Sequence, residues 1–199
     1  MNQPLPKLML ASRSPRRRQL LAEAGYPFEV CPPSEAAEGG LCDQESPLEL
    51  VSRLAYQKAA EVVRRISTGL VLGCDTVAEC DGRILGKPEG EDHARTMLKL
   101  LSGREHRVLS GLCLWEAPAG PPQIRAAVTH LRMEPLSDHK LNEYLASGLW
   151  EGKAGAFGYQ DGIDWVHVIA GSESNVVGLP MELLAEMIDE WRADRRREI

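Results

Sequence analysis

Residues 8–25 read LMLASRSPRRRQLLAEAG, and this stretch predicts a strand, a tight turn and a helix in immediate succession. The apolar run 8–11 is typical of a short buried strand. Ser14 followed by Pro15 is typical of a helix start, because serine caps free N–H groups and proline fits the first helical position. Gly25 then marks the end of the helix.

The rest of the chain continues with alternating strand and helix patterns. Ser46 and Glu49 have the spacing of a capping box, and they open a helix that we expect to reach about residue 66. Asp81-Gly82 predicts a hairpin turn. Further strands are predicted at 26–31, 70–78, 83–86, 105–115 and 123–133, and further helices at 91–101, 137–148 and from 180. This order predicts an α/β fold with a largely mixed or antiparallel sheet, in which residues 1–199 form a single domain.

Composition and charge exclude several classes of function. The 199 residues are 43% hydrophobic, as in ordinary globular proteins, and their net charge of -6 repels polyanions, so we predict no nucleic-acid partner. The five cysteines contain no CxxC pair, which argues against zinc and disulfide frameworks. The apolar stretch at the N-terminus is too short for a signal peptide or a membrane span, so we expect a cytoplasmic protein that does not contact a membrane.

The common nucleotide-binding and hydrolase motifs are absent from the sequence. There is no GxxxxGK[ST], no GxGxxG, no HExxH and no GxSxG. These absences argue against a P-loop, a dinucleotide-binding fold, a zinc protease and a serine hydrolase.

A first candidate for binding lies in ASRSPRR, residues 11–17, where Arg16 and Arg17 fall in the first turn of the expected helix. Free N–H groups and the helix dipole attract anions there, whereas cations are disfavoured by about 0.3–1 kcal/mol. A phosphate ligand would explain why the arginines are tolerated. The alternative is a simple helix cap with solvated arginines, and this motif alone favours neither interpretation.

A second candidate is Asp75 in GCDTV, residues 73–77, because a carboxylate within an apolar run is costly unless something pairs with it. A metal ion or a catalytic water would account for it, and an Asp bonded to nearby backbone N–H groups is the structural alternative. Lys87 in ILGKP follows the hairpin that returns the chain beside Asp75, although a lysine before a proline is usually a surface charge. Together these cues fit hydrolysis of a triphosphate, for which Arg16, Arg17, Lys58 and Lys87 supply cations and Asp75 a carboxylate.

The sequence resembles the Maf proteins, which are nucleoside triphosphate pyrophosphatases. The resemblance rests on six ordered blocks that span nearly the whole chain: LASRSPRRRQLL, RLAYQKA, GCDTVAECDGRILGKP, MLKLLSGREHRV, GKAGAFGYQDG and SNVVGLP. It implies an elongated mixed sheet flanked by helices, related to the inosine triphosphatase architecture, with two lobes around a central cleft. It also implies water attack at the α-phosphate, a divalent metal (Mg²⁺, Mn²⁺ or Co²⁺) and a homodimer.

The resemblance also implies roles for individual residues. Asp75 would be the general base or would activate a metal-linked water, with Lys87 beside it at the catalytic centre. Glu38 would join Asp75 in binding the metal, although the family usually has an acidic pair where this chain reads SEAAEGG, and Glu35 is the fallback. The predicted substrate-binding residues are Ser12, Ser14, Arg16, Arg17, Lys58, Thr76 and Gln160.

Within the family, the resemblance is to the branch that acts on dTTP and UTP. Arg16 and Gln160 resemble that branch, whereas the branch acting on 7-methyl-GTP tends to have Glu in place of the Gln. A glutamine both donates and accepts hydrogen bonds, which suits a neutral pyrimidine edge. A 7-methyl-GTP pyrophosphatase, a non-catalytic nucleotide-binding regulator of cell division, and nucleic-acid binding through the arginines remain as alternatives.

Overall fold

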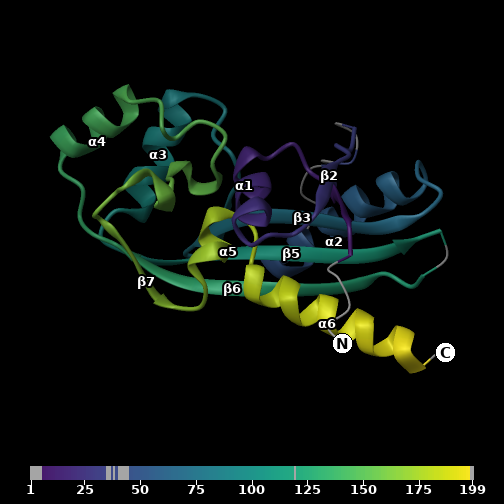
Figure 1. Ribbon diagram of the computed structural model, residues 1–199. Coiled ribbons are helices and arrows are strands. Elements are labelled where there is room, and N and C mark those ends of the chain that lie inside the picture. Colours follow the sequence, from purple (N-terminus) through teal and green to yellow (C-terminus); the bar gives the residue numbers. More distant parts are fainter. Residues whose placement is uncertain (1–5, 35–36, 38, 40–44, 119, 198–199) are drawn as a thin grey trace.

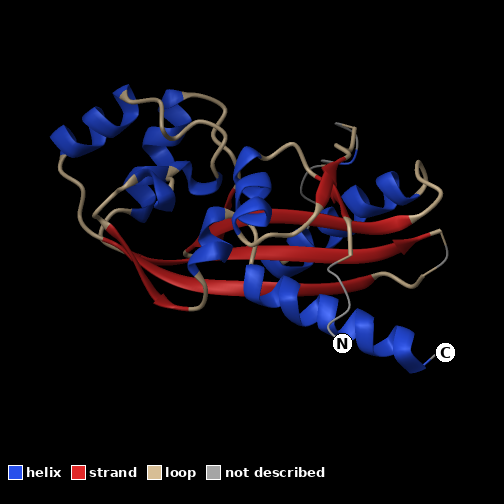
Figure 2. Cartoon of the chain, viewed as in Figure 1, coloured by secondary structure: helices blue, strands red, loops and turns tan. Residues whose placement is uncertain are grey.

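A single sheet of seven strands organises the molecule (Figures 1 and 2). The computed structural model describes residues 6–34, 37, 39, 45–118 and 120–197. Its strands are β1 (Leu8–Ala11), β2 (Phe28–Val30), β3 (Gly69–Cys80), β4 (Arg83–Leu85), β5 (Glu105–Ala117), β6 (Gln123–Met133) and β7 (Val166–Ala170). Its helices are α1 (Pro15–Glu23), α2 (Pro47–Val63), α3 (Glu91–Leu101), α4 (Asp138–Ala146), α5 (Glu173–Val177) and α6 (Met181–Arg197), with the 3-10 turns η2 (Ala154–Ala156) and η3 (Tyr159–Asp161).

The sheet is mixed. Its strand order is β2-β1-β3-β5-β6-β7, and β4 pairs with the far part of β3. β1 lies parallel to both of its neighbours, while the remaining pairs are antiparallel. The predicted α/β class with an elongated mixed sheet and flanking helices is therefore confirmed.

Side-chain alternation along β3 assigns each residue to one face of the sheet. Leu70, Leu72 and Cys74 pack with residues of α1 and α6 in one apolar cluster. Val71 points the other way and packs against α2. Asp75 therefore falls on the face covered by α2, and Thr76 on the face of α1.

Two glycines let α2 lie directly on the sheet. A Cβ on Gly73 would be 2.2 Å from the carbonyl oxygen of Ala55, and one on Gly111 would be 2.2 Å from that of Val51. Both of these carbonyl oxygens belong to the backbone of α2. Because the helix begins at a complete capping box of Ser46 and Glu49, as predicted, its start and its distance from the sheet are both fixed.

The apolar core is divided between the two ends of the sheet, which gives the predicted two lobes. One cluster joins α3 and α4 to residues such as Phe157 and Trp165. The clusters around α1, α2 and α6 occupy the other end, and Figure 1 shows α3 and α4 set apart from these helices. No helix among the described residues is both long and apolar enough to cross a membrane.

The predicted elements agree with the structure except near the C-terminal third. Residues 165–177 contain β7 and α5, and neither is among the elements predicted from the sequence. β7 joins the sheet through only four residue pairs with β6, at a point where the register shifts. A short strand in which none of the last four residues is buried lacks the regular alternation that would have predicted it.

Candidate functional site

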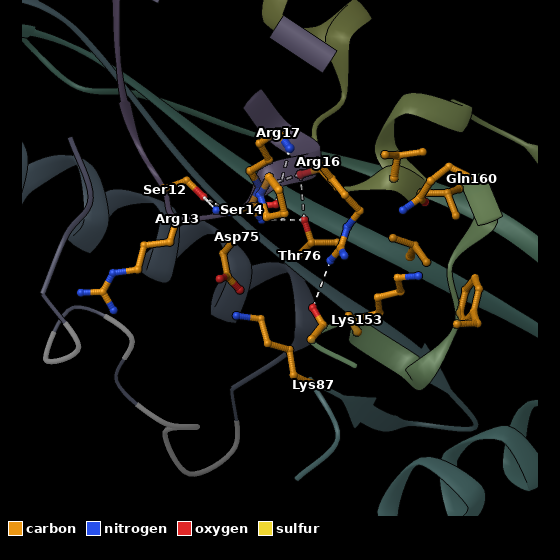
Figure 3. A pocket seen from close by; sticks show the side chains of 18 of the residues that line it. Ser12, Arg13, Ser14, Arg16, Arg17, Asp75, Thr76, Lys87, Lys153 and Gln160 are labelled. Carbon is orange, nitrogen blue, oxygen red and sulfur yellow. Dashed lines mark hydrogen bonds between the residues drawn. The ribbon is translucent and has the colours of Figure 1, made fainter. Parts of the chain in front are cut away.

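A gap along the edge of β3 creates the site. β1 ends where Ala11 pairs with Gly73, and β4 ends where Leu85 pairs with Ala78. Neither of these described strands reaches Asp75 or Thr76, so they leave this edge of β3 unpaired at this point. A pocket of about 350 Å³ opens here, between the two lobes (Figure 3).

The start of α1 borders the pocket. Ser14 caps the helix by accepting a hydrogen bond from the N–H group of Arg17, and Pro15 occupies the first turn, as predicted. The N–H group of Ser14 in turn donates to the Ser12 hydroxyl at 3.2 Å. This turn aims the positive end of the helix dipole at the pocket, where an anion would be stabilised.

Arg17 is buried and holds the surrounding backbone together. Its guanidinium donates to the Ser12 hydroxyl, the Thr76 hydroxyl and the carbonyl oxygens of Cys74 and Gly178, at 2.8–3.1 Å. These acceptors come from three separate segments: the turn before α1, two positions of β3, and the end of α5. Arg17 lines the pocket, but these four bonds make it a structural hub.

Asp75 meets Lys58 across the interface between β3 and α2. The Lys58 Nζ lies 2.6 Å from the Asp75 Oδ1, and their side chains are only 6% and 14% exposed. The structural alternative raised by the sequence, an Asp held by backbone N–H groups alone, does not describe this carboxylate. Asp75 lines the pocket, and Figure 3 shows the Lys87 side chain directed toward it.

Lys87 arrives through the hairpin of β3 and β4, as the sequence predicted. The carbonyl oxygen of the preceding Gly86 accepts a hydrogen bond of 3.0 Å from the N–H group of Gly155. The backbone next to Lys87 is therefore hydrogen-bonded to η2, while the Lys87 side chain is exposed to the pocket.

Arg16 extends from α1, in one lobe, across the cleft to the lobe that contains α3 and α4. Its Nη2 donates to the carbonyl oxygen of Gly152 at 3.0 Å. Burial lowers the pKa of Arg16, and the neighbouring Arg17 lowers it further, with Asp161 partly opposing them. A half-buried cation next to a second cation gains from an anionic ligand, so this position favours phosphate binding.

The other end of the pocket is more apolar. Val108, Phe157, Val176 and Val177 line it together with Gln160. Figure 3 shows Gln160 at the opposite side of the view from Arg13 and Ser12. A ligand with a charged end and a flat, weakly polar end would match this division.

The structure brings together all of the predicted site residues that it describes. Ser12, Ser14, Arg16, Arg17, Lys58, Asp75, Thr76, Lys87 and Gln160 all line this pocket. Glu38 and its fallback Glu35 lie outside the described residues, so the predicted metal pair is untested. Lys153 and Phe157 also line the pocket, but the sequence analysis did not single them out. Both residues lie in the GKAGAFGYQDG block, where the glycines leave no regular spacing that predicts which side chains point inward.

The described oxygen ligands suit a divalent cation that is shared with a substrate. No group of three or more acidic, histidine or cysteine side chains with metal-binding geometry occurs in the described part of the chain. Asp75 nevertheless presents a carboxylate to the pocket, with the Ser12 and Thr76 hydroxyls nearby. Mg²⁺ is commonly bound by one or two carboxylates, waters and substrate phosphates, and this donor set fits that pattern.

Fold and site together define an α/β protein with a cation-lined cleft at an interrupted sheet edge. Residues 7–191 match the family described as Maf-like protein, and the chain belongs to this family. The predicted family is thus confirmed.

Curated relatives resemble the chain over nearly its full length. The dTTP/UTP pyrophosphatase of Rhodopirellula baltica is 56% identical over 96% of this chain and 84% of that protein. The protein of the same name from Ruminiclostridium cellulolyticum is 39% identical over 92% of this chain and 94% of its own. A solved structure of a nucleoside-triphosphatase, a dITP/XTP pyrophosphatase from Mycobacterium abscessus, aligns with a TM-score of 0.46 at 15% identity, over 94% of this chain and 97% of that one.

Proposed function

We propose that this chain is a nucleoside triphosphate pyrophosphatase that hydrolyses dTTP and UTP to the monophosphate and pyrophosphate. One observation carries the proposal: the Asp75 carboxylate, 2.6 Å from Lys58, lies in the same pocket as Arg16 and Lys87. The described lining contains six cationic side chains and two carboxylates, although the whole chain has a net charge of -6. A concentration of cations around one carboxylate suits a bound polyphosphate and a water aimed at it. The names of the curated relatives support the same activity.

In this proposal Asp75 is the general base for the attacking water. The water oxygen forms a bond to the α-phosphorus, its proton passes to Asp75, and the bond from the α-phosphorus to the bridging oxygen breaks to release pyrophosphate. Arg16, Lys58 and Lys87 stabilise the negative charge that develops on the leaving group. The N-terminus of α1 and the Ser12 hydroxyl orient the phosphate chain.

A divalent cation would be held by Asp75, with Glu38 as the proposed second ligand. When bound, such a cation neutralises phosphate charge and lowers the pKa of a coordinated water. Activity is expected to require Mg²⁺, Mn²⁺ or Co²⁺ and to disappear in EDTA, whereas full turnover in the chelator would remove the metal from the proposal. A parallel titration of metal binding by calorimetry separates loss of the ion from loss of the fold.

The apolar end of the pocket is the proposed base site. Phe157 and the valines of α5 would contact the faces of a base, and Gln160 would bond its edge. A glutamine amide can donate to a pyrimidine carbonyl and accept from its N–H group. Action in the cytoplasm and as a homodimer, both predicted from the sequence, belongs to the same proposal.

The most informative experiment is a panel of substrates. Pyrophosphate release is measured from the four common ribonucleotides, dTTP, 5-methyl-UTP, pseudo-UTP and 7-methyl-GTP. We expect dTTP and UTP to exceed the purine nucleotides in kcat/KM by about tenfold or more. Preference for 7-methyl-GTP would assign the protein to the branch that acts on that nucleotide. Tight nucleotide binding without any turnover would identify a non-catalytic regulator.

A further inference from the structure

A buried ion pair lies within a loop-rich segment of the lobe that contains α3 and α4. Lys153 Nζ contacts Asp161 Oδ2, and the two side chains are only 9% and 13% exposed. Both residues belong to the segment 151–161, which contains η2 and η3 and carries Phe157 and Gln160 into the pocket. The mechanism proposed above gives this pair no part.

The pair packs directly against the backbone that precedes Gln160. A Cβ on Gly158 would lie 1.9 Å from the Asp161 Oδ2 and 2.4 Å from the Lys153 Nζ, so only glycine fits beneath the pair. On its other side, the N–H group of Gly158 donates to the Tyr144 hydroxyl at 3.1 Å. Residue 158 is therefore held between the ion pair and α4.

Further hydrogen bonds hold the first half of the segment to the rest of the protein. Gly152 accepts a hydrogen bond from Arg16, and Gly155 donates one to Gly86. The ion pair is the side-chain link that closes the segment on itself, since it joins its third residue to its last. Gln160 is adjacent to Asp161 in the chain, so a shift of Asp161 shifts Gln160.

We propose that Lys153 and Asp161 are positioning residues that fix Gln160 and Phe157 and thereby set the base preference of this site. The inference rests on the proposed function, because it assigns base selection within that site. Lys153 also borders the pocket and could otherwise be taken for another phosphate ligand. Its ammonium group, however, is directed at Asp161, and removing either partner would leave the other charge buried without its counter-ion.

The test compares Lys153→Met, Asp161→Asn and the double variant with the wild-type protein. For each, kcat and KM are measured with dTTP and dCTP, and the inhibition constant is measured with inorganic pyrophosphate, which has no base. We expect each single variant to lower the ratio of kcat/KM for dTTP over dCTP by about tenfold. Pyrophosphate inhibition of Lys153→Met should stay within about twofold of the wild-type value, because the ammonium group that it removes is directed at Asp161 and not at the phosphate end. The double variant should be no worse than the poorer single variant, since the two changes remove the same contact.

A matched control is available nearby. Lys140 and Asp164 form an ion pair of 2.8 Å whose side chains are 41% and 82% exposed. Lys140→Met removes the same type of charge from the surface of the same lobe, and it should leave every constant unchanged. Thermal unfolding of all variants shows which of them remain folded at the assay temperature.

Three results would overturn the inference while leaving the proposed function intact. Lys153→Met could weaken pyrophosphate inhibition as strongly as dTTP turnover, which would make Lys153 a phosphate ligand. Both folded single variants could retain the wild-type ratio of kcat/KM for dTTP over dCTP. The double variant could also lower this ratio by the combined effect of the two single variants. If instead the wild-type protein hydrolyses no nucleotide, the proposed function fails, and dissociation constants for dTTP and dCTP still test the positioning role.

Discussion

Lys58 donates a hydrogen bond of 2.6 Å to Asp75, and this contact joins helix α2 to the central strand at the edge of the pocket. Alternation along β3 turns Asp75 toward α2, and Gly73, two residues earlier on the same face, lets the helix approach closely enough for the contact. The carboxylate is thereby held at the mouth of the strand gap. The contact is a charge-assisted hydrogen bond, which is shorter and stronger than one between neutral groups.

Asp75→Asn should abolish most of the turnover while preserving nucleotide binding. The amide keeps the size of the carboxylate but accepts no proton from water, and loss of a general base typically lowers kcat by about 100- to 10,000-fold. Single-turnover kinetics with dTTP, together with calorimetric titration of the nucleotide, separate the two effects. Normal turnover by the variant would show that Asp75 is not the base.

Glu79→Gln provides the matched control for that substitution. Glu79 is also a buried carboxylate on β3, but it accepts hydrogen bonds from Arg107 and from the N–H group of Gly82, away from the pocket. We expect this variant to be less stable and to retain its kcat. A similar loss of kcat in both variants would point to a general disturbance of the strand.

Arg17→Met should destabilise the protein more than it weakens substrate binding. The arginine side chain makes four hydrogen bonds to three segments, and the substitution removes all four of them. We expect the free energy of unfolding to fall by about 3–5 kcal/mol, as measured by urea denaturation. Arg18→Met, an exposed neighbour on the same helix, should be nearly neutral. Unchanged stability with loss of dTTP affinity alone would identify Arg17 as a direct ligand.

The sequence predicted the elements of the fold because most of their boundaries are marked by local chemistry. Ser14, Ser46 and Ser137 each cap a helix at the predicted position, and Asp81-Gly82 forms the predicted turn. β7 and α5 were missed because both are short and depend on contacts far away in the chain. The buried Asn175 of α5, for example, bonds Val108 of β5 and Thr129 of β6, and a single sequence contains no sign of these partners.

The candidate site was predictable where residue type alone indicated function, and not where geometry decides it. A carboxylate in an apolar strand identified Asp75, but the pairing of that carboxylate with Lys58 depends on how closely α2 approaches the sheet. Arg17 could be assigned to the site but not to its structural role, since that role follows from acceptors in distant segments. Lys153 and Asp161, eight residues apart in a glycine-rich stretch, have no regular spacing that predicts an ion pair.

Gly111→Ala should push α2 away from the sheet and weaken the contact between Lys58 and Asp75. The new Cβ would lie 2.2 Å from the carbonyl oxygen of Val51, and backbone cannot move aside as a flexible side chain can. We expect a loss of about 2–3 kcal/mol in the free energy of unfolding, accompanied by a lower kcat. Gly90→Ala, where nothing lies within 4 Å of the added methyl group, should cost less than about 1 kcal/mol. Equal stability of the two variants would contradict the close approach of α2.

A buried histidine behind the base end of the pocket should make the fold sensitive to acid. His106 is 3% exposed, its ring packs edge-on against Phe157 with centroids 5.4 Å apart, and neither ring nitrogen has a hydrogen-bond partner among the described residues. Burial is the largest cause that lowers the pKa of His106 from 6.5 to about 4, while the Arg104 backbone and, less strongly, the Glu79 carboxylate partly oppose it. The folded state therefore favours the neutral ring, and the unfolded state takes up a proton at higher pH.

The resulting stabilisation is fully present above the unfolded pKa of 6.5 and is lost as pH falls toward the folded value of about 4. The shift corresponds to about 3 kcal/mol. Urea unfolding of the wild-type protein and of His106→Phe at neutral pH and near pH 4 measures it, because the variant keeps an aromatic ring against Phe157 but has no proton to gain. Between neutral pH and pH 4, we expect the free energy of unfolding to fall by about 3 kcal/mol more in the wild-type protein than in the variant. Equal acid sensitivity of the two proteins would mean that His106 is not held neutral by the fold, and that other groups cause the loss.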